Sequence, residues 1–115
     1  MDCLFCKIIA GEIPSSKVFE NESVYAFNDI NPLAPVHVLI VPKKHIENVD
    51  DLKSGDASII GDMFLAAQKI AELKGVKGAF RIVTNNGKDG GQEVFHLHLH
   101  LLGGRKAMGP ILNKE

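Results

Sequence analysis

The stretch that decides the fold is His96-Leu97-His98-Leu99-His100-Leu101-Leu102. Histidine alternates with leucine, and a period of two predicts a β-strand with two different faces. We expect the leucines, joined by Val94, to face the core and the three imidazoles to line the other face. Because a strand rises about 3.3 Å per residue, the outer two histidines are expected to lie roughly 13 Å apart. One small ion cannot bind all three, so the pattern predicts divided functions, the alternative being a polar face that happens to be rich in histidine.

Length and charge limit the classes of protein that the chain can belong to. A chain of 115 residues, 45% hydrophobic and 23% charged, is typical of one globular domain. The net charge of −1 gives no general attraction for nucleic acids or acidic membranes. No apolar run has the length of a membrane span, and the N-terminus lacks the basic region of a signal peptide. We expect a cytoplasmic protein with a single domain over residues 1–115, of which 106–115 form a C-terminal tail.

The N-terminal segment carries both cysteines of the chain. Residues 3–10 are predicted to form a short helix that ends at Gly11. Cys3 and Cys6 are three residues apart and would lie on one side of a helical turn. They could form a disulfide, a redox pair or half of a zinc site. The zinc interpretation, which we favour, needs two further ligands, and the chain has histidines to supply them.

The middle of the chain reads as strands around one long helix. Strands are expected over residues 17–20, 23–28, 36–41 and 79–84, and a helix over residues 57–74. Ser54 or Asp56 can supply the N-cap of this helix, and Gly75 can end it. Its apolar arc is wider than packing on one sheet requires, which a homodimer contact or a deeper core would explain.

Three further features can be read in two ways. Asp29, in a proline-bordered loop, could cap a turn or bind sugar hydroxyls, and the pattern alone favours the turn. His37 lies in an apolar strand, where a histidine is usually a hydrogen-bonded core residue. The glycine-rich loop over residues 85–93 could be a simple connection, or its backbone N–H groups could approach an anion. Its position next to the three histidines favours phosphate binding.

Taken together, these motifs resemble the histidine-triad superfamily, and within it the histidine triad nucleotide-binding branch of purine nucleoside phosphoramidate hydrolases. The family motif His-x-His-x-His followed by two apolar residues is matched by residues 96–102. Further matches are Phe5-x-Lys7-Ile8-Ile9, Glu12-Ile13-Pro14, Ala26-Phe27-x-Asp29-Ile30-x-Pro32, Pro42-Lys43-Lys44-His45, Gly90-Gly91-Gln92 and Leu102-Gly103-Gly104-Arg105. The resemblance covers residues 3–105. It implies an α+β fold, a five-stranded antiparallel sheet with two helices, and a ten-stranded sheet across a homodimer.

The resemblance also implies roles for individual residues. His98 would be the nucleophile that attacks the α-phosphorus of a nucleotide, His100 would contact the phosphate oxygens, and His37 would support them. The implied nucleotide-binding residues are Leu4, Phe5, Ile8, Phe27 and Ile30 for the base, Asp29 for the ribose hydroxyls, and, for the phosphate, Asn85 and backbone groups of Gly91, Gln92 and Glu93 beside His98 and His100. A neutral imidazole suits this role, because it is a nucleophile at pH 7 without prior deprotonation.

A structural zinc site follows from the same resemblance, which is closest to zinc-containing bacterial-type members. Its implied ligands are Cys3, Cys6, His45 and His96, a closed Cys₂His₂ set with no open position for a substrate.

The chain departs from the family pattern at Glu93, where many members carry a small hydroxyl residue, often serine. A carboxylate repels a phosphate, so leaving-group preference is the property expected to differ.

The implied activity is hydrolysis of the P–N bond in purine nucleoside 5′-phosphoramidates, derivatives of AMP or GMP, through a nucleotidyl-histidine intermediate. Two alternatives remain. One is a dinucleoside polyphosphate hydrolase. The other is a zinc-stabilised nucleotide-binding module that acts through protein interactions with little turnover.

Overall fold

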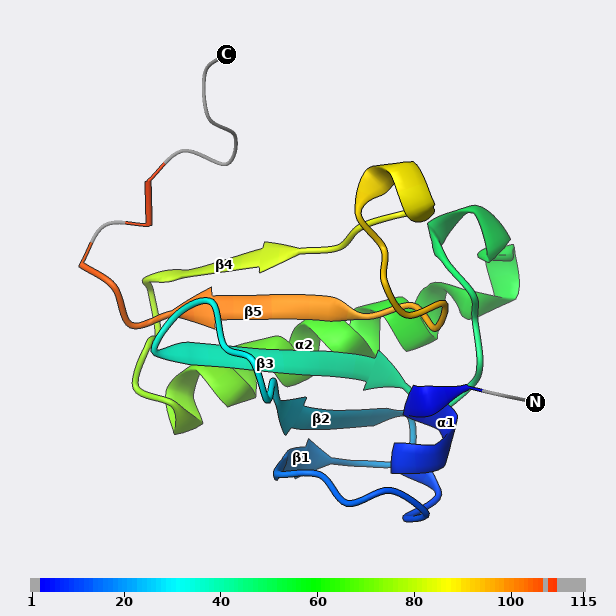
Figure 1. The fold of residues 1–115 in the computed structure, drawn as a ribbon, viewed down its shortest axis with the longest axis horizontal. Helices are drawn as coiled ribbons and strands as arrows, with labels where there is room; N and C mark the ends of the chain where they lie inside the picture. The colour runs from blue at the N-terminus through cyan, green and yellow to red at the C-terminus, as the bar shows by residue number, and fades with distance from the viewer. Residues whose placement is uncertain (1–2, 107, 110–115) are drawn as a thin grey trace.

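A five-stranded antiparallel sheet forms the framework of the protein, in the strand order β1-β2-β3-β5-β4 (Figure 1). The computed structural model describes residues 3–106, 108 and 109. The strands are β1 (Lys17–Glu20), β2 (Val24–Asn28), β3 (Val36–Pro42), β4 (Phe80–Val83) and β5 (Leu99–Gly103), and the helices are α1 (Leu4–Ile9) and α2 (Ala57–Leu73). The predicted α+β fold with five antiparallel strands and two helices is confirmed. Most of the expected tail, residues 107 and 110–115, lies outside the described residues.

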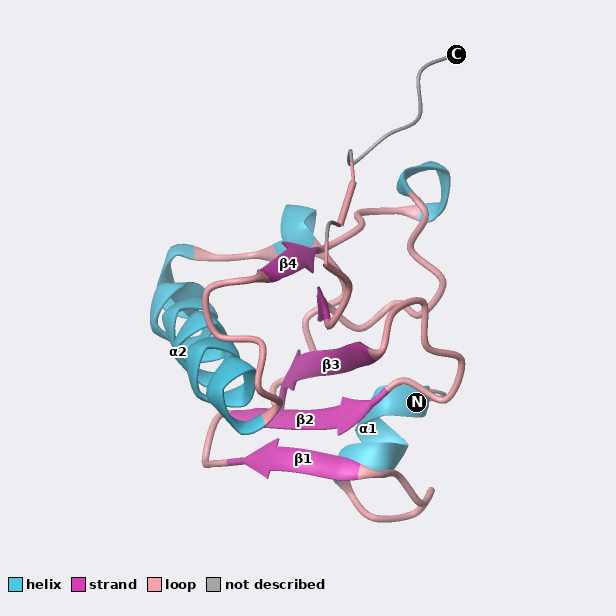
Figure 2. Cartoon of the chain, turned by 90° about the vertical axis from the view of Figure 1, so that its left-hand side faces the viewer, coloured by secondary structure: helices cyan, strands magenta, loops and turns pink. Residues whose placement is uncertain are grey.

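The two helices cover opposite faces of the sheet (Figure 2). The alternating residues of β2 show the division: Val24 and Ala26 pack under α2, whereas Tyr25 and Phe27 pack with α1. Buried residues thus occupy both faces of β2, so it reads as a continuous apolar run. The cluster on the α1 side is the smaller one, and it borders the histidines.

The histidine stretch is less regular than predicted. The strand β5 begins only at Leu99, so His96 and His98 precede it. The segment leaves the ladder because the N–H of Leu97 donates to the carbonyl of Ile46 at 2.7 Å instead of to a strand neighbour. The three alternating leucines at 97, 99 and 101 are buried as expected. Val94 does not join them, and packs instead on the α1 side.

The long helix α2 packs on the sheet through small residues. Its buried residues are Met63, Ala66, Ala67, Ile70 and Ala71, and three of these five are alanines. Phe64 and Leu73, two apolar residues of the same helix, are 48% and 66% exposed. Gly75 follows the helix with φ +73°, the left-handed conformation that ends a helix and favours glycine. None of the helices in the described part of the chain is both long and apolar enough to span a membrane.

Asp56 occupies the N-cap position of α2 as expected, but its side chain does not cap the helix. Its carboxylate accepts hydrogen bonds from Lys44 Nζ at 2.6 Å and from the N–H of Lys53 at 3.0 Å. These bonds, the one to Lys44 first, lower the pKa of Asp56 below its ordinary value. The interaction ties the segment that follows β3 to the start of α2.

Candidate functional site

A cavity of about 580 Å³ opens on the α1 side of the sheet. It is lined by most of the residues that the sequence predicted for nucleotide binding, namely Leu4, Phe5, Ile8, Phe27, Asp29, Ile30, Asn85, Gly91, Glu93, His98 and His100, and by His37. Further lining residues, which the sequence did not indicate, include Ser15, Ser16 and Leu39. Apolar side chains from α1 and β2 therefore meet three imidazoles and two carboxylates in one space.

His98 lies in the wall of this cavity with only one nitrogen free. Its Nδ1 is 2.7 Å from the carbonyl oxygen of His96. Because a carbonyl can only accept, Nδ1 carries the proton, and Nε2 keeps its lone pair in the neutral ring. Burial lowers the pKa of His98 below its ordinary value of 6.5, which keeps the ring neutral at pH 7. The result is a fixed imidazole that can use Nε2 as a nucleophile.

His100 and His37 form a chain of hydrogen bonds whose direction is also fixed. The N–H of Leu33 donates to His37 Nδ1 at 3.0 Å, so the proton of His37 must be on Nε2. That Nε2–H is 2.9 Å from His100 Nδ1, which must accept, so the neutral His100 ring carries its proton on Nε2. Burial, with the neighbouring His98 and His37 adding to it, lowers the pKa of His100 to about 4. His100 can therefore offer an N–H donor beside the nucleophile.

Asp29 caps the turn, as the pattern favoured, and it also lines the cavity. Its Oδ1 accepts from the N–H of Asn31 at 2.8 Å, which is the turn-capping bond. Its Oδ2 lies 3.4 Å from His37 Nε2, and the side chain lines the cavity. The turn thus holds a carboxylate in the lining of the cavity.

The glycine loop is anchored by the side chain of Gln92, a residue that the resemblance implies for phosphate binding through its backbone. Gln92 is 4% exposed and does not line the cavity. Its Oε1 accepts from the N–H of Gly87 at 2.8 Å, and its Nε2 donates to the carbonyls of Glu47 and Val94 at 2.8 and 3.0 Å. An amide has both donors and acceptors, so it can satisfy three buried backbone groups at once. Gln92 positions the loop instead of binding through its side chain.

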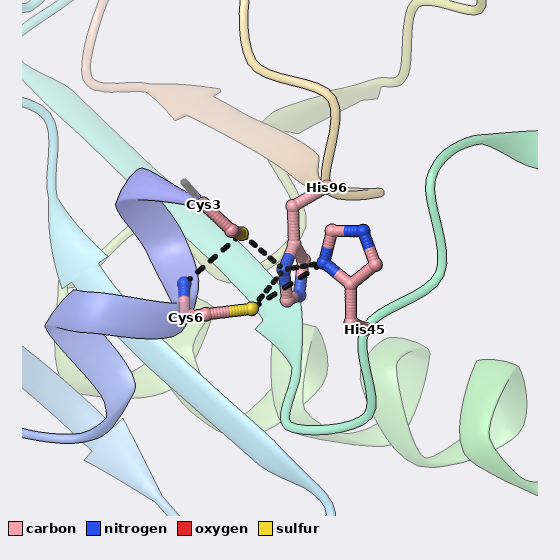
Figure 3. Close-up of side chains that lie close together, drawn as sticks. All are labelled: Cys3, Cys6, His45 and His96. Carbon is pink, nitrogen blue, oxygen red and sulfur yellow. Dashed lines mark hydrogen bonds between the residues drawn. The ribbon is translucent and has the colours of Figure 1, made fainter. Parts of the chain in front are cut away.

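Cys3, Cys6, His45 and His96 converge on a second site at the end of α1 (Figure 3). The Cys3 Sγ and Cys6 Sγ atoms lie 3.3 and 3.5 Å from His96 Nδ1. His45 Nδ1 lies 3.3 Å from Cys6 Sγ and 3.2 Å from His96 Nδ1. Tetrahedral zinc, with bonds of about 2.3 Å to sulfur and about 2.0–2.1 Å to nitrogen, separates S and N by about 3.5 Å and two nitrogens by about 3.3 Å. The four residues are close enough to hold a metal ion, and their spacing fits zinc.

The proton positions around this cluster agree with a metal site. His96 Nε2 lies 2.8 Å from the carbonyl of Pro42, so it donates there and leaves the Nδ1 lone pair facing the sulfurs. One lone pair cannot satisfy three surrounding groups by hydrogen bonding, whereas a cation can lie between all four. Burial, and then the neighbouring Cys3 thiol, raise the pKa of Cys6 to about 11. A bound cation would reverse this shift by stabilising the thiolate.

The sequence did not indicate two of the groups that order the site. The N–H of Leu33 sets the tautomer of His37, and the Thr84 hydroxyl donates to the carbonyl of His98 at 2.7 Å. The first is a backbone group, which no residue type can reveal. A threonine at the end of a predicted strand is equally uninformative until the fold places the segment that contains His98 beside it.

The fold, together with the cavity lined by His98 and His100 and the cluster that contains His96, defines a member of the histidine-triad class. Comparison with known proteins supports this assignment. The HIT domain family matches residues 10–107. The chain belongs to the HIT domain family, and the expected resemblance is confirmed.

Several relatives share the whole domain. A HIT family hydrolase from Clostridium thermocellum superimposes with a TM-score of 0.92 and 53% sequence identity, covering 96% of this chain and 97% of that one. A HIT family hydrolase from Legionella pneumophila superimposes with a TM-score of 0.91 and 47% sequence identity, covering 95% of this chain and 98% of that one. The purine nucleoside phosphoramidase of Escherichia coli K12 is 45% identical over 112 residues, 96% of this chain and 93% of that protein. The chain is thus similar to hydrolases over nearly its full length.

Proposed function

We propose that the protein hydrolyses purine nucleoside 5′-phosphoramidates through a nucleotidyl intermediate on His98. The observation that carries the proposal is the fixed tautomer of His98, which leaves Nε2 unprotonated in the wall of the cavity. The similarity to a purine nucleoside phosphoramidase supports the same substrate class.

The reaction would proceed in two displacements at phosphorus. The Nε2 lone pair of His98 forms a bond to the α-phosphorus, and the bond from phosphorus to the leaving nitrogen breaks. Its electron pair stays on that nitrogen, which takes up a proton and departs as the amine. Water then attacks the phosphorus, releases a proton, and returns the electron pair to Nε2 as the nucleoside monophosphate leaves. The ring is positively charged in the intermediate, and its Nδ1–H bond to the carbonyl of His96 stabilises that charge.

The remaining lining residues would bind the other parts of the nucleotide. The apolar side chains of Phe5, Ile8 and Phe27 suit a purine base, and the Asp29 carboxylate can accept hydrogen bonds from ribose hydroxyls. The His100 Nε2–H, the Asn85 amide and the backbone around Gly91 provide donors for phosphate oxygens. These donors would stabilise the charge on the transferring phosphoryl group.

The cavity is poorly suited to the alternative substrate, a dinucleoside polyphosphate. Within residues 3–106, 108 and 109, no lysine or arginine lines it, while the carboxylates of Asp29 and Glu93 do. A polyphosphate chain would bring several negative charges next to Glu93 with no cation to offset them. A phosphoramidate carries a single ionised phosphoryl group, and its leaving group is an amine.

We also propose that Cys3, Cys6, His45 and His96 hold a structural zinc ion. When bound, the ion would supply a fixed cross-link between α1 and the segment before β5, and all four ligand positions would be used by protein. The two cysteines are free thiols, which suits the reducing cytoplasm. We further propose a homodimer, since Phe64, Leu65 and Leu73 are exposed apolar residues of α2 and β4 is an edge strand of the sheet.

The test is hydrolysis of adenosine 5′-phosphoramidate by the zinc-loaded protein and by His98→Ala. The wild type should release AMP, and the variant should lose at least about 10³-fold in kcat, because the covalent route is removed. Equal turnover by both proteins would exclude His98 as the nucleophile. Tight AMP binding without any turnover would favour the interaction-module alternative.

A further inference from the structure

Glu93 is a charged group in the cavity to which the proposed chemistry gives no role. Its side chain is exposed and lines the cavity with His98, His100 and Asn85. The ion pairs found among the described residues involve other carboxylates, those of Glu20, Asp29, Asp56 and Glu72. Among the described residues, Glu93 therefore lines the cavity without a cation paired to its carboxylate.

The position of Glu93 relative to the nucleophile fixes which part of a substrate it meets. Figure 1 shows α1 and the loop over residues 85–93, in yellow, on the two sides of the start of β5. A nucleotide with its base against α1 and its phosphorus at His98 fills the apolar side. The group that leaves phosphorus then extends to the polar side, where Asn85, Gly91 and Glu93 lie.

The charges of the cavity distinguish between classes of leaving group. Asp29 is already engaged by the N–H of Asn31 and lies beside His37, whereas Glu93 is free to bind an incoming group. An anionic leaving group would be repelled by Glu93, a neutral amine would gain nothing from it, and a cationic one would pair with it. Since Glu93 is exposed, the attraction is that of a solvated ion pair, modest and sensitive to salt.

We propose that Glu93 selects nucleoside 5′-phosphoramidates whose leaving amine carries a second, positively charged nitrogen, as in the conjugate of a diamine. This inference rests on the proposed function and narrows its substrate class. Glu93 would act as a specificity-determining residue that binds the distant ammonium, and it would take no part in the transfer at phosphorus.

The experiment compares three adenosine phosphoramidates whose leaving amines have the same chain length: putrescine, butylamine and γ-aminobutyrate. They end in a cation, a methyl group and a carboxylate. For the zinc-loaded wild type, kcat/KM should fall by about fivefold at each step in that order, the effect of a solvated ion pair. In 1 M salt the differences should shrink, because screening shortens the reach of the charge to about 3 Å.

Three variants isolate the contribution of Glu93. Glu93→Gln should bring the three kcat/KM values within about twofold of one another, and Glu93→Lys should reverse their order. Asp89→Asn is the matched control: it removes the same charge from the same loop at a residue that does not line the cavity, and it should keep the wild-type order.

The outcomes separate this inference from the proposed function. If all three compounds are hydrolysed and Glu93→Gln keeps the wild-type ratios of kcat/KM, the proposal that Glu93 selects the leaving group is wrong. The proposed phosphoramidate hydrolysis is then still supported. If the wild type hydrolyses none of them, and adenosine 5′-phosphoramidate is not hydrolysed either, the proposed function is wrong and the inference with it.

Discussion

Single hydrogen bonds decide what each imidazole in this protein can do. His96 donates through Nε2 to Pro42, which turns Nδ1 to the cysteines, whereas His98 donates through Nδ1 and keeps Nε2 for the cavity. Two histidines two residues apart thus present opposite nitrogens to different sites. The divided functions that the alternating pattern predicts would follow from these bonds. The pattern could not assign the tautomers, because the partners are backbone carbonyls.

The pH dependence of the reaction follows from the burial of His98 and His100. His98 is nucleophilic only when neutral, and burial lowers its pKa below the ordinary 6.5, although the charges of Asp29 and Glu93 oppose the shift. His100 has a pKa of about 4 and stays neutral over the same range. Protonation should therefore remove half of the activity only at a pH below 6.5. We expect kcat/KM for adenosine 5′-phosphoramidate to fall by less than about twofold from pH 7.5 to 6.5, roughly half a pH unit to either side of neutrality. An acid limb of kcat/KM with its midpoint above pH 6.5 would contradict the lowered pKa of His98.

His37 is predicted to be a positioning residue. Its Nε2–H is the donor to His100 Nδ1, and His37→Ala would leave that buried acceptor without a partner. An unsatisfied buried group costs about 1–3 kcal/mol, so kcat should fall by roughly 10- to 100-fold with a smaller change in KM. His37→Gln keeps a side-chain N–H donor and should recover part of the loss. A wild-type kcat in His37→Ala would rule out this role.

Among the elements, those with local signals were predicted well and those set by distant contacts were not. Strands β1 to β4 and helix α2 lie within one residue of their expected bounds, since alternation, capping and glycine signals are local. The start of β5 was placed three residues too early. The segment before it bonds to Ile46, which is distant in sequence, so the histidine pattern alone could not show the departure.

The glycine loop should depend on Gln92 for its shape. Gln92→Ala removes three hydrogen bonds from a buried position and leaves the N–H of Gly87 and the carbonyls of Glu47 and Val94 to find new partners. We expect the free energy of unfolding to fall by about 2–3 kcal/mol, measured by urea denaturation. Asp89→Ala, at an exposed position of the same loop, should change it by less than about 0.5 kcal/mol. Equal effects of the two substitutions would show that the anchor is unimportant.

At the scale of the whole molecule, the Cys₂His₂ cluster is linked to the cavity that His98 lines. It joins α1, which carries the apolar side of the cavity, to His96, whose carbonyl orients the proposed nucleophile His98. The four metal-site residues were assigned from the sequence only through the family resemblance. Cys3 and Cys6 indicated half a site by spacing, but His45 lies 39 residues from Cys6 and needs the fold to reach it.

Removal of zinc should therefore affect stability and catalysis together. Chelation, or Cys6→Ser, should lower Tm by roughly 5–10 °C, because a ligand bound only by the folded state no longer stabilises it. Activity should fall in the same titration, and readdition of zinc to the chelated wild type should restore both. The measurements are a thermal melt and a metal content by mass spectrometry. A purified protein without stoichiometric zinc and with an unchanged Tm after chelation would contradict the site.

The central claim is that an unprotonated Nε2 on His98 forms a bond to phosphorus. The most direct test is rapid acid quenching of the zinc-loaded protein with adenosine 5′-phosphoramidate, followed by intact-mass and peptide mass spectrometry. We predict an adenylyl adduct on the peptide that contains His98, formed within the first turnover and absent from His98→Ala. An adduct on another residue, or full turnover with no adduct on the millisecond timescale, would contradict the account.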